Sequence, residues 1–290
     1  MNSDASTVDL ATDPLGFAIE ALGDRSRGAP EAVAAARRAR AILDSESFPR
    51  ASVDAARALA LGVRALALGG QPVAPAVARE AIEAAECWLE SASPAEESAR
   101  ADAQEARGVA RLAVSEQADG PDARMLEAAA MDLLAAAQYR QQAGDAEAAA
   151  RTDLEIAEAF AVYPADDRAP LIERAVGHAR RAAGTLTPEV DPTAHARCQL
   201  LLSGLLLDHP RSDPQQFAPA AQGLADTALT VVDEERAPLV AARAWQARAR
   251  AQEIRGLADH TAAYARAAEL LDIAGLTGAS RRLRQQHGCA

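Results

Sequence analysis

The sequence contains no lysine, few aromatic residues and only three cysteines. All 30 of its cationic residues are arginine, and phenylalanine, tryptophan and tyrosine together make up 3% of its 290 residues. Without lysine, the chain has neither a Schiff-base nucleophile nor the lysine of a phosphate-binding P-loop. The cysteines Cys87, Cys198 and Cys289 are far apart in the sequence, which fits a reducing compartment and indicates neither a disulfide framework nor a zinc site.

Long apolar runs and clustered positive charge are also missing. No stretch reaches the roughly 18 apolar residues of a membrane span, and the first residues lack the basic and apolar regions of a secretory signal. We therefore expect a cytoplasmic chain without a membrane segment. The formal net charge is −12. This acidity argues against nucleic acid as a partner, because phosphate binding needs clustered cations.

Alanine dominates what is present, at roughly a quarter of the chain. It is the best helix former and is depleted in strands. Hydrophobic residues make up 49% and charged residues 25%, a composition typical of folded domains. The composition therefore predicts an all-α fold.

The predicted helices form two interleaved series with one period of about 46 residues. Helices of the first series are expected to start near Glu31, Ala76, Ala123, Arg168, Gln216 and His260. Those of the second series are expected to start near Ala51, Glu97, Asp145, Thr193 and Glu235. Two series with a common period predict a helical hairpin that is repeated along the chain.

Glycine and proline recur at fixed places in this repeat. Gly62, Gly108 and Gly204 lie one or two periods apart within the second series. Glycine inside a helix costs about 1 kcal/mol relative to alanine, so its recurrence predicts that helices approach closely at these points. Pro170, Pro219 and Pro238 are expected in first helical turns, where proline is tolerated.

Two segments resemble the tetratricopeptide-repeat family. Leu133–Ala150 has a turn glycine, Gly144, followed by Asp145, and Ala244–Leu271 has Trp245 at the start of a helix and Gly256 in the turn. The resemblance extends from Leu15 to Leu283, although the family's common period is about 34 residues. The long repeats look like those of actinobacterial regulators and of arrays beside CHAT peptidase domains, but no peptidase domain is present.

This resemblance implies the architecture. We expect a flexible tail over residues 1–13, followed by one domain over residues 14–290. The domain is expected to be a right-handed α-solenoid of about six tetratricopeptide-like hairpins.

No motif points to catalysis. Asp191 and His195 are four residues apart, which is a possible spacing for metal ligands, but Asp191 lies in a proline-bounded loop, so ordinary loop roles are favoured. Asp166-Asp167 is interpreted as a helix cap and Cys198 as a buried structural thiol, while Cys289 is expected to be exposed. We expect no cofactor, no bound metal and no enzymatic activity.

Stacked hairpins form a curved array whose concave wall is lined by one helix of each pair. The resemblance assigns that wall to the second helix series. The phase of the small residues selects eight polar residues as inward-facing candidates for partner binding, namely Asp102, Glu105, Glu158, Asp208, His209, Arg243, Arg250 and Glu253. Their mixed charges favour a protein or peptide partner, and the net acidity favours one with a basic segment.

The sequence therefore predicts a non-enzymatic scaffold or adaptor that binds a protein or peptide on its concave face. An alternative is a regulatory module gated by a small ligand or a peptide. An all-α enzyme is less favoured, because the sequence shows no converging carboxylates or histidines.

Overall fold

A computed structural model of the chain describes residues 30, 33–38, 41, 49–68, 73–117 and 122–289. Every regular element in these ranges is an α-helix, which confirms the predicted all-α class. The predicted tail, residues 1–13, lies outside the described residues.

The helices follow one another with short connections. Their bounds are α3 Pro49–Leu68, α4 Pro75–Ser91, α5 Glu97–Gln117, α6 Ala123–Ala143, α7 Ala146–Val162, α8 Ala169–Thr185, α9 Pro192–Asp208, α10 Pro214–Val231, α11 Pro238–Ile254, α12 His260–Ile273 and α13 Thr277–His287. From α3 to α12, helices of the same series start 45–49 residues apart, so the predicted period is present in the structure.

Local signals set many of these boundaries. The Asp122 carboxylate accepts hydrogen bonds from two backbone N–H groups in the first turn of α6, and the Asp145 carboxylate caps α7 by accepting one, from the Ala148 N–H. Between them, Gly144 has a φ of 75°, a left-handed conformation that glycine adopts without strain. Pro170 and Pro238 lie in first turns as predicted. Pro219 does not, because α10 begins at Pro214 and places it inside the helix.

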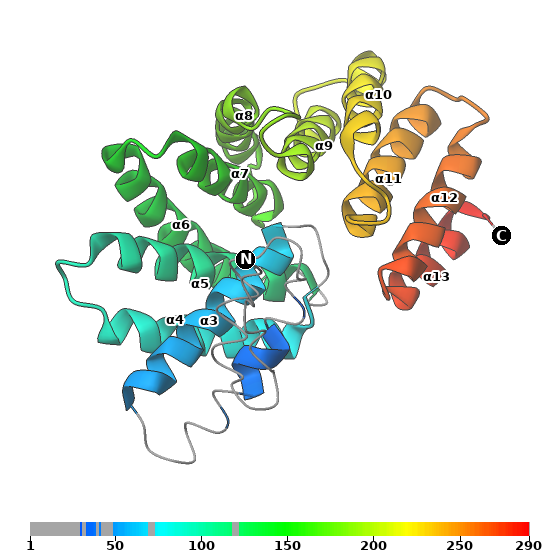
Figure 1. Cartoon of the computed structure of the whole chain (residues 1–290). Helices are drawn as coiled ribbons and strands as arrows, with labels where there is room; N and C mark the ends of the chain where they lie inside the picture. Colours follow the sequence, from blue (N-terminus) through cyan, green and yellow to red (C-terminus); the bar gives the residue numbers. More distant parts are fainter. Residues whose placement is uncertain are drawn as a thin grey trace, which may run out of the picture.

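Each helix packs against the next, and the odd-numbered helices also pack against one another. The next-but-one pairs in contact are α3 with α5, α5 with α7, α7 with α9, and α9 with α11. Figure 1 shows the resulting arc, with α7, α9 and α11 on its inner side and α8 and α10 on its outer side. This arrangement of consecutive neighbours is consistent with a solenoid. We call α3, α5, α7, α9 and α11 the inner row.

Alanine makes up much of the core between the helices. Ala81, Ala106, Ala157, Ala225 and Ala249, for example, have no exposed surface. Small side chains let the helix backbones lie close together, and Gly108 shows how close. A Cβ atom added there would lie 2.8 Å from Leu133 Cγ of α6. At Gly204 of α9 such an atom would meet nothing within 4 Å, so the predicted close approach is wrong at that glycine.

Two of the cysteines are buried. Cys198 has no exposed surface, and burial raises the pKa of its thiol to about 12, which agrees with a structural role. Cys289 was expected to be exposed, but it is buried beside Ala249, Ala263 and Tyr264. None of the described helices is long and apolar enough to cross a membrane.

Candidate functional site

Arginine–carboxylate pairs join successive helices of the inner row. Arg64 of α3 lies 2.6 Å from Glu105 of α5, and Arg250 of α11 lies 2.6 Å from Asp208 of α9. A third pair, also 2.6 Å apart, joins Arg197 of α9 to Glu155 of α7. The partners are 41 or 42 residues apart, close to one repeat, so these pairs connect neighbouring hairpins.

Two of the predicted partner-binding residues, Asp102 and Glu105, face the interior of the array. Both pair with Arg140 of α6, and Glu105 also accepts a hydrogen bond from the Thr152 hydroxyl of α7. The Glu105 side chain has no exposed surface. It was selected as an exposed group, so the structure corrects that expectation, since a partner in the groove cannot touch it.

Glu158 is a third predicted residue. It shares the guanidinium of Arg197 with Glu155, which the sequence analysis did not select. Arg197 contacts Glu155 at 2.6 Å and Glu158 at 2.7 Å. Burial, together with the nearby charges of Glu158 and Glu105, raises the pKa of Glu155 to about 8 against the attraction of Arg197. Because one cation faces two carboxylates, a proton on Glu155 balances the charge at the joint between α7 and α9.

This raised pKa predicts a pH dependence that Glu155→Gln should remove. Between its ordinary pKa of 4.5 and about 8, the folded carboxyl keeps a proton that the unfolded chain has lost. The free energy of unfolding contributed by Glu155 therefore falls as the pH rises through this window. Urea unfolding of both proteins from pH 4.5 to 8.5 measures the effect. A stability difference between them that does not change with pH would contradict it.

The other predicted residues lie at the end of α9 and along α11. Asp208, Arg243, Arg250 and Glu253 are exposed, although each makes a contact within the chain. Glu253 accepts a hydrogen bond from the Tyr264 hydroxyl at 2.8 Å, and His209 Nδ1 accepts a hydrogen bond from the Arg211 N–H. The structure thus brings Asp208 and Arg250 together where α9 and α11 end.

A cavity of about 660 Å³ opens beside Asp208, where α7 ends. We call it the inner cavity. Its lining consists of Ala161, Val162, Tyr163, Pro164, Ala165, Asp166, Arg168 and Asp208. Arg168 donates to the Ala161 carbonyl, whereas the Asp166 carboxylate has no hydrogen bond or ion pair within the part of the chain that the structure describes. The cavity therefore combines an apolar wall with two carboxylates.

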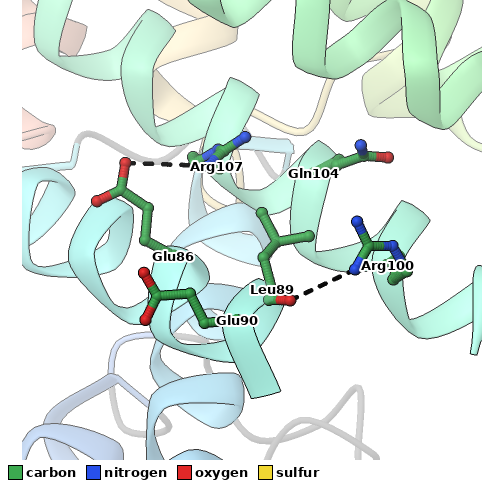
Figure 2. Close-up of a pocket in the computed structure, with 6 residues that line it drawn as sticks. All are labelled: Glu86, Leu89, Glu90, Arg100, Gln104 and Arg107. Atoms are coloured by element: carbon green, nitrogen blue, oxygen red, sulfur yellow. Dashed lines mark hydrogen bonds and ion pairs between the residues drawn. The ribbon is translucent and has the colours of Figure 1, made fainter. Parts of the chain in front are cut away.

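A second hollow lies between α4 and α6, on the face of α5 that is opposite to Asp102 and Glu105. Figure 2 shows its first part, of about 370 Å³, lined by Glu86, Leu89, Glu90, Arg100, Gln104 and Arg107. The adjoining part, of about 290 Å³, is lined by Pro94, Glu97, Arg100, Gln104, Ala135, Gln138, Tyr139 and Gln142. Arg100 and Gln104 line both parts, so we treat them as one outer groove. Sequence analysis did not identify it.

The residues considered for metal binding or catalysis have structural contacts. Asp191 caps α9 by accepting from the Ala194 N–H, and His195 Nδ1 lies 2.9 Å from the Leu186 carbonyl. Asp167 accepts a hydrogen bond from the Ala169 N–H at 3.0 Å, but the N-cap of α8 is Arg168, so Asp167 lies one residue before the cap position. Within the described ranges, no three His, Cys, Asp or Glu side chains are grouped so that they could hold a metal ion.

No family model matches the chain, and no curated protein matches its sequence.

Proposed function

We propose that this chain is a non-enzymatic scaffold or adaptor that binds a basic segment of a partner protein at its inner row. In this proposal the array is a right-handed solenoid of about six tetratricopeptide-like hairpins and works in the cytoplasm. The inner cavity carries the proposal, because it opens where α7 and α9 of the inner row end and contains two carboxylates.

The chemistry of the cavity suits an arginine or lysine side chain. The Asp166 and Asp208 carboxylates provide acceptors for a guanidinium or an ammonium group. Tyr163 and Val162 provide an apolar wall for the methylene stem, and an aromatic ring also attracts a cation. Asp208 already pairs with Arg250, so a bound guanidinium would share this carboxylate with Arg250.

The test is affinity capture with the native chain and with the Asp166→Asn/Asp208→Asn variant, followed by calorimetry on a synthetic peptide that covers the basic segment of the captured protein. We expect the peptide to bind the native chain at least tenfold more tightly than the variant, a difference of about 1.4 kcal/mol. A matched control, Glu173→Gln/Glu235→Gln, removes two exposed acidic groups elsewhere. Equal loss in the control would contradict a site at the cavity.

The alternative of a ligand-gated regulatory module has one observation in its favour. Among the described neighbouring helices, α8 and α9 pack least extensively, and the inner cavity lies next to this joint. A small molecule that fills the cavity could therefore change how the two halves of the array meet. It would raise the melting temperature of the chain by mass action, whereas a scaffold without such a ligand would show no shift in a small-molecule thermal screen.

A further inference from the structure

The outer groove exists because α4 and α6 both pack on α5 but leave part of its surface uncovered. Arg100, Gln104 and Arg107 lie along this uncovered side of α5. On the other side of the same helix, Asp102 and Glu105 contact Arg140 and Arg64. The outer groove thus lies on the opposite side of α5 from these contacts, and it shares no lining residue with the inner cavity.

The cations of the groove are already engaged within the chain. Arg107 and Arg111 both contact Asp132 of α6, and both lie near Glu86 of α4. Arg100 reaches the carbonyls of Leu89 and Ala92 at the end of α4, each at 3.5 Å, and Figure 2 shows the first of these contacts. These guanidinium groups therefore offer little attraction to an anionic ligand.

The groups without a partner are of a different kind. Among the described residues, none of the following makes a hydrogen bond or ion pair: the carboxylates of Glu90 and Glu97, the amides of Gln104, Gln138 and Gln142, and the hydroxyl of Tyr139. Side-chain amides both donate and accept, so they can pair with the N–H and C=O groups of an extended peptide. The free charges are negative and complement arginine or lysine.

We propose that the outer groove is a second docking surface, which binds a short extended segment of a partner protein that carries basic side chains. Packed helices lie about 8–10 Å apart, so a path from α4 across α5 to α6 is about 16–20 Å long. An extended chain rises about 3.3 Å per residue, and five or six residues would cover this path. Glu90 lies on its α4 side, and Glu97 lies where α5 begins.

Fluorescence anisotropy with two labelled hexapeptides tests the proposal. One is Gly-Arg-Ala-Ala-Arg-Gly, and the other has glutamate in place of both arginines. We expect the arginine peptide to bind the native chain and the Glu90→Gln/Glu97→Gln variant to weaken binding roughly tenfold. The Glu173→Gln/Glu235→Gln control removes the same charge elsewhere and should change the Kd less than twofold. A second variant, Gln104→Ala, tests the amide contact without any change of charge and should also weaken binding.

Several outcomes would overturn the proposal. They are no binding of the arginine peptide, equal binding of the glutamate peptide, and equal weakening by the control. The Asp166→Asn/Asp208→Asn variant separates the two sites. If it weakens this peptide while the Glu90→Gln/Glu97→Gln variant does not, the peptide lies in the inner cavity, and the groove proposal fails while the proposed function stands. Circular dichroism melts confirm that each variant folds.

Discussion

Replacing Arg197 by methionine is expected to lower the free energy of unfolding by about 3–5 kcal/mol, because it leaves the buried Glu155 and the partly buried Glu158 without their shared guanidinium. Arg197 is 7% exposed, and its partner Glu155 is 3% exposed. Methionine keeps much of the apolar stem but none of the five N–H donors. Glu155 keeps the proton that it already holds at pH 7, whereas Glu158 would lose its guanidinium partner.

Urea unfolding at pH 7 measures this effect. The control is Arg211→Met, at an exposed arginine whose side chain makes no hydrogen bond or ion pair with the described residues, and it should change stability by less than about 0.5 kcal/mol. A double variant, Arg197→Met/Glu155→Leu, should recover part of the loss, since leucine replaces a buried carboxyl group that has lost its hydrogen-bond donor. If Arg197→Met lowers the free energy of unfolding no more than Arg211→Met does, the contacts of Arg197 with Glu155 and Glu158 contribute nothing to stability.

Substitution by alanine is expected to lower stability at Gly108 and to raise it at Gly204, although both glycines lie at the same position of the sequence repeat. At Gly108 the new methyl group would lie 2.8 Å from Leu133 Cγ and 3.2 Å from the Ala129 carbonyl oxygen, and relief requires α5 and α6 to move apart. Overpacking of this kind costs about 1–3 kcal/mol. At Gly204 the methyl group meets nothing, so the higher helix propensity of alanine should raise stability by about 0.5–1 kcal/mol.

Thermal and urea unfolding of the two single variants check this contrast. Because both substitutions add the same methyl group within an α-helix, each serves as the control for the other. The interpretation fails if the two changes have the same sign. Gly204→Ala should also leave the helix content of the protein unchanged, which far-ultraviolet circular dichroism can verify.

The helices could be predicted because their boundaries depend on nearby residues. Asp122 caps α6 through N–H groups two and three residues away, and Gly144 ends the same helix with a local left-handed turn. Signals of this range can be identified without any tertiary information. The repeat period then follows from the spacing of the helix starts, and it predicts which helices lie in the same row.

The burial and the pairing of individual charged residues could not be predicted from such local signals. Glu105 looks like a solvated acid in its own helix, and only Arg64 and Arg140, 41 and 35 residues away, make it a buried group. Helical periodicity indicates which residues share a face, but not whether a neighbouring repeat supplies a partner for that face. Cys289 was misjudged for the same reason, because Tyr264 and Leu283 cover it from other turns.

The candidate site was missed in part because it depends on gaps between helices. Gln104 and Tyr139 have no special spacing, and they line a groove only because α4 and α6 leave the same part of α5 uncovered. The pairing of Glu155 with Arg197, by contrast, could have been predicted from the sequence. The spacing of about 42 residues between an acidic residue and an arginine recurs at Glu155–Arg197 and Asp208–Arg250, and a search at the repeat period would have identified both pairs.

The neighbour-only packing also determines how the chain should respond to mechanical load. The described helices pack extensively only within a hairpin or against the adjacent hairpin, so a pulling force applied at the two ends passes through each interface in series. The weakest interface should yield first while the remaining hairpins stay folded. Each hairpin of about 46 residues would release a contour length of roughly 150–165 Å, and the array would extend in steps of that size under tension.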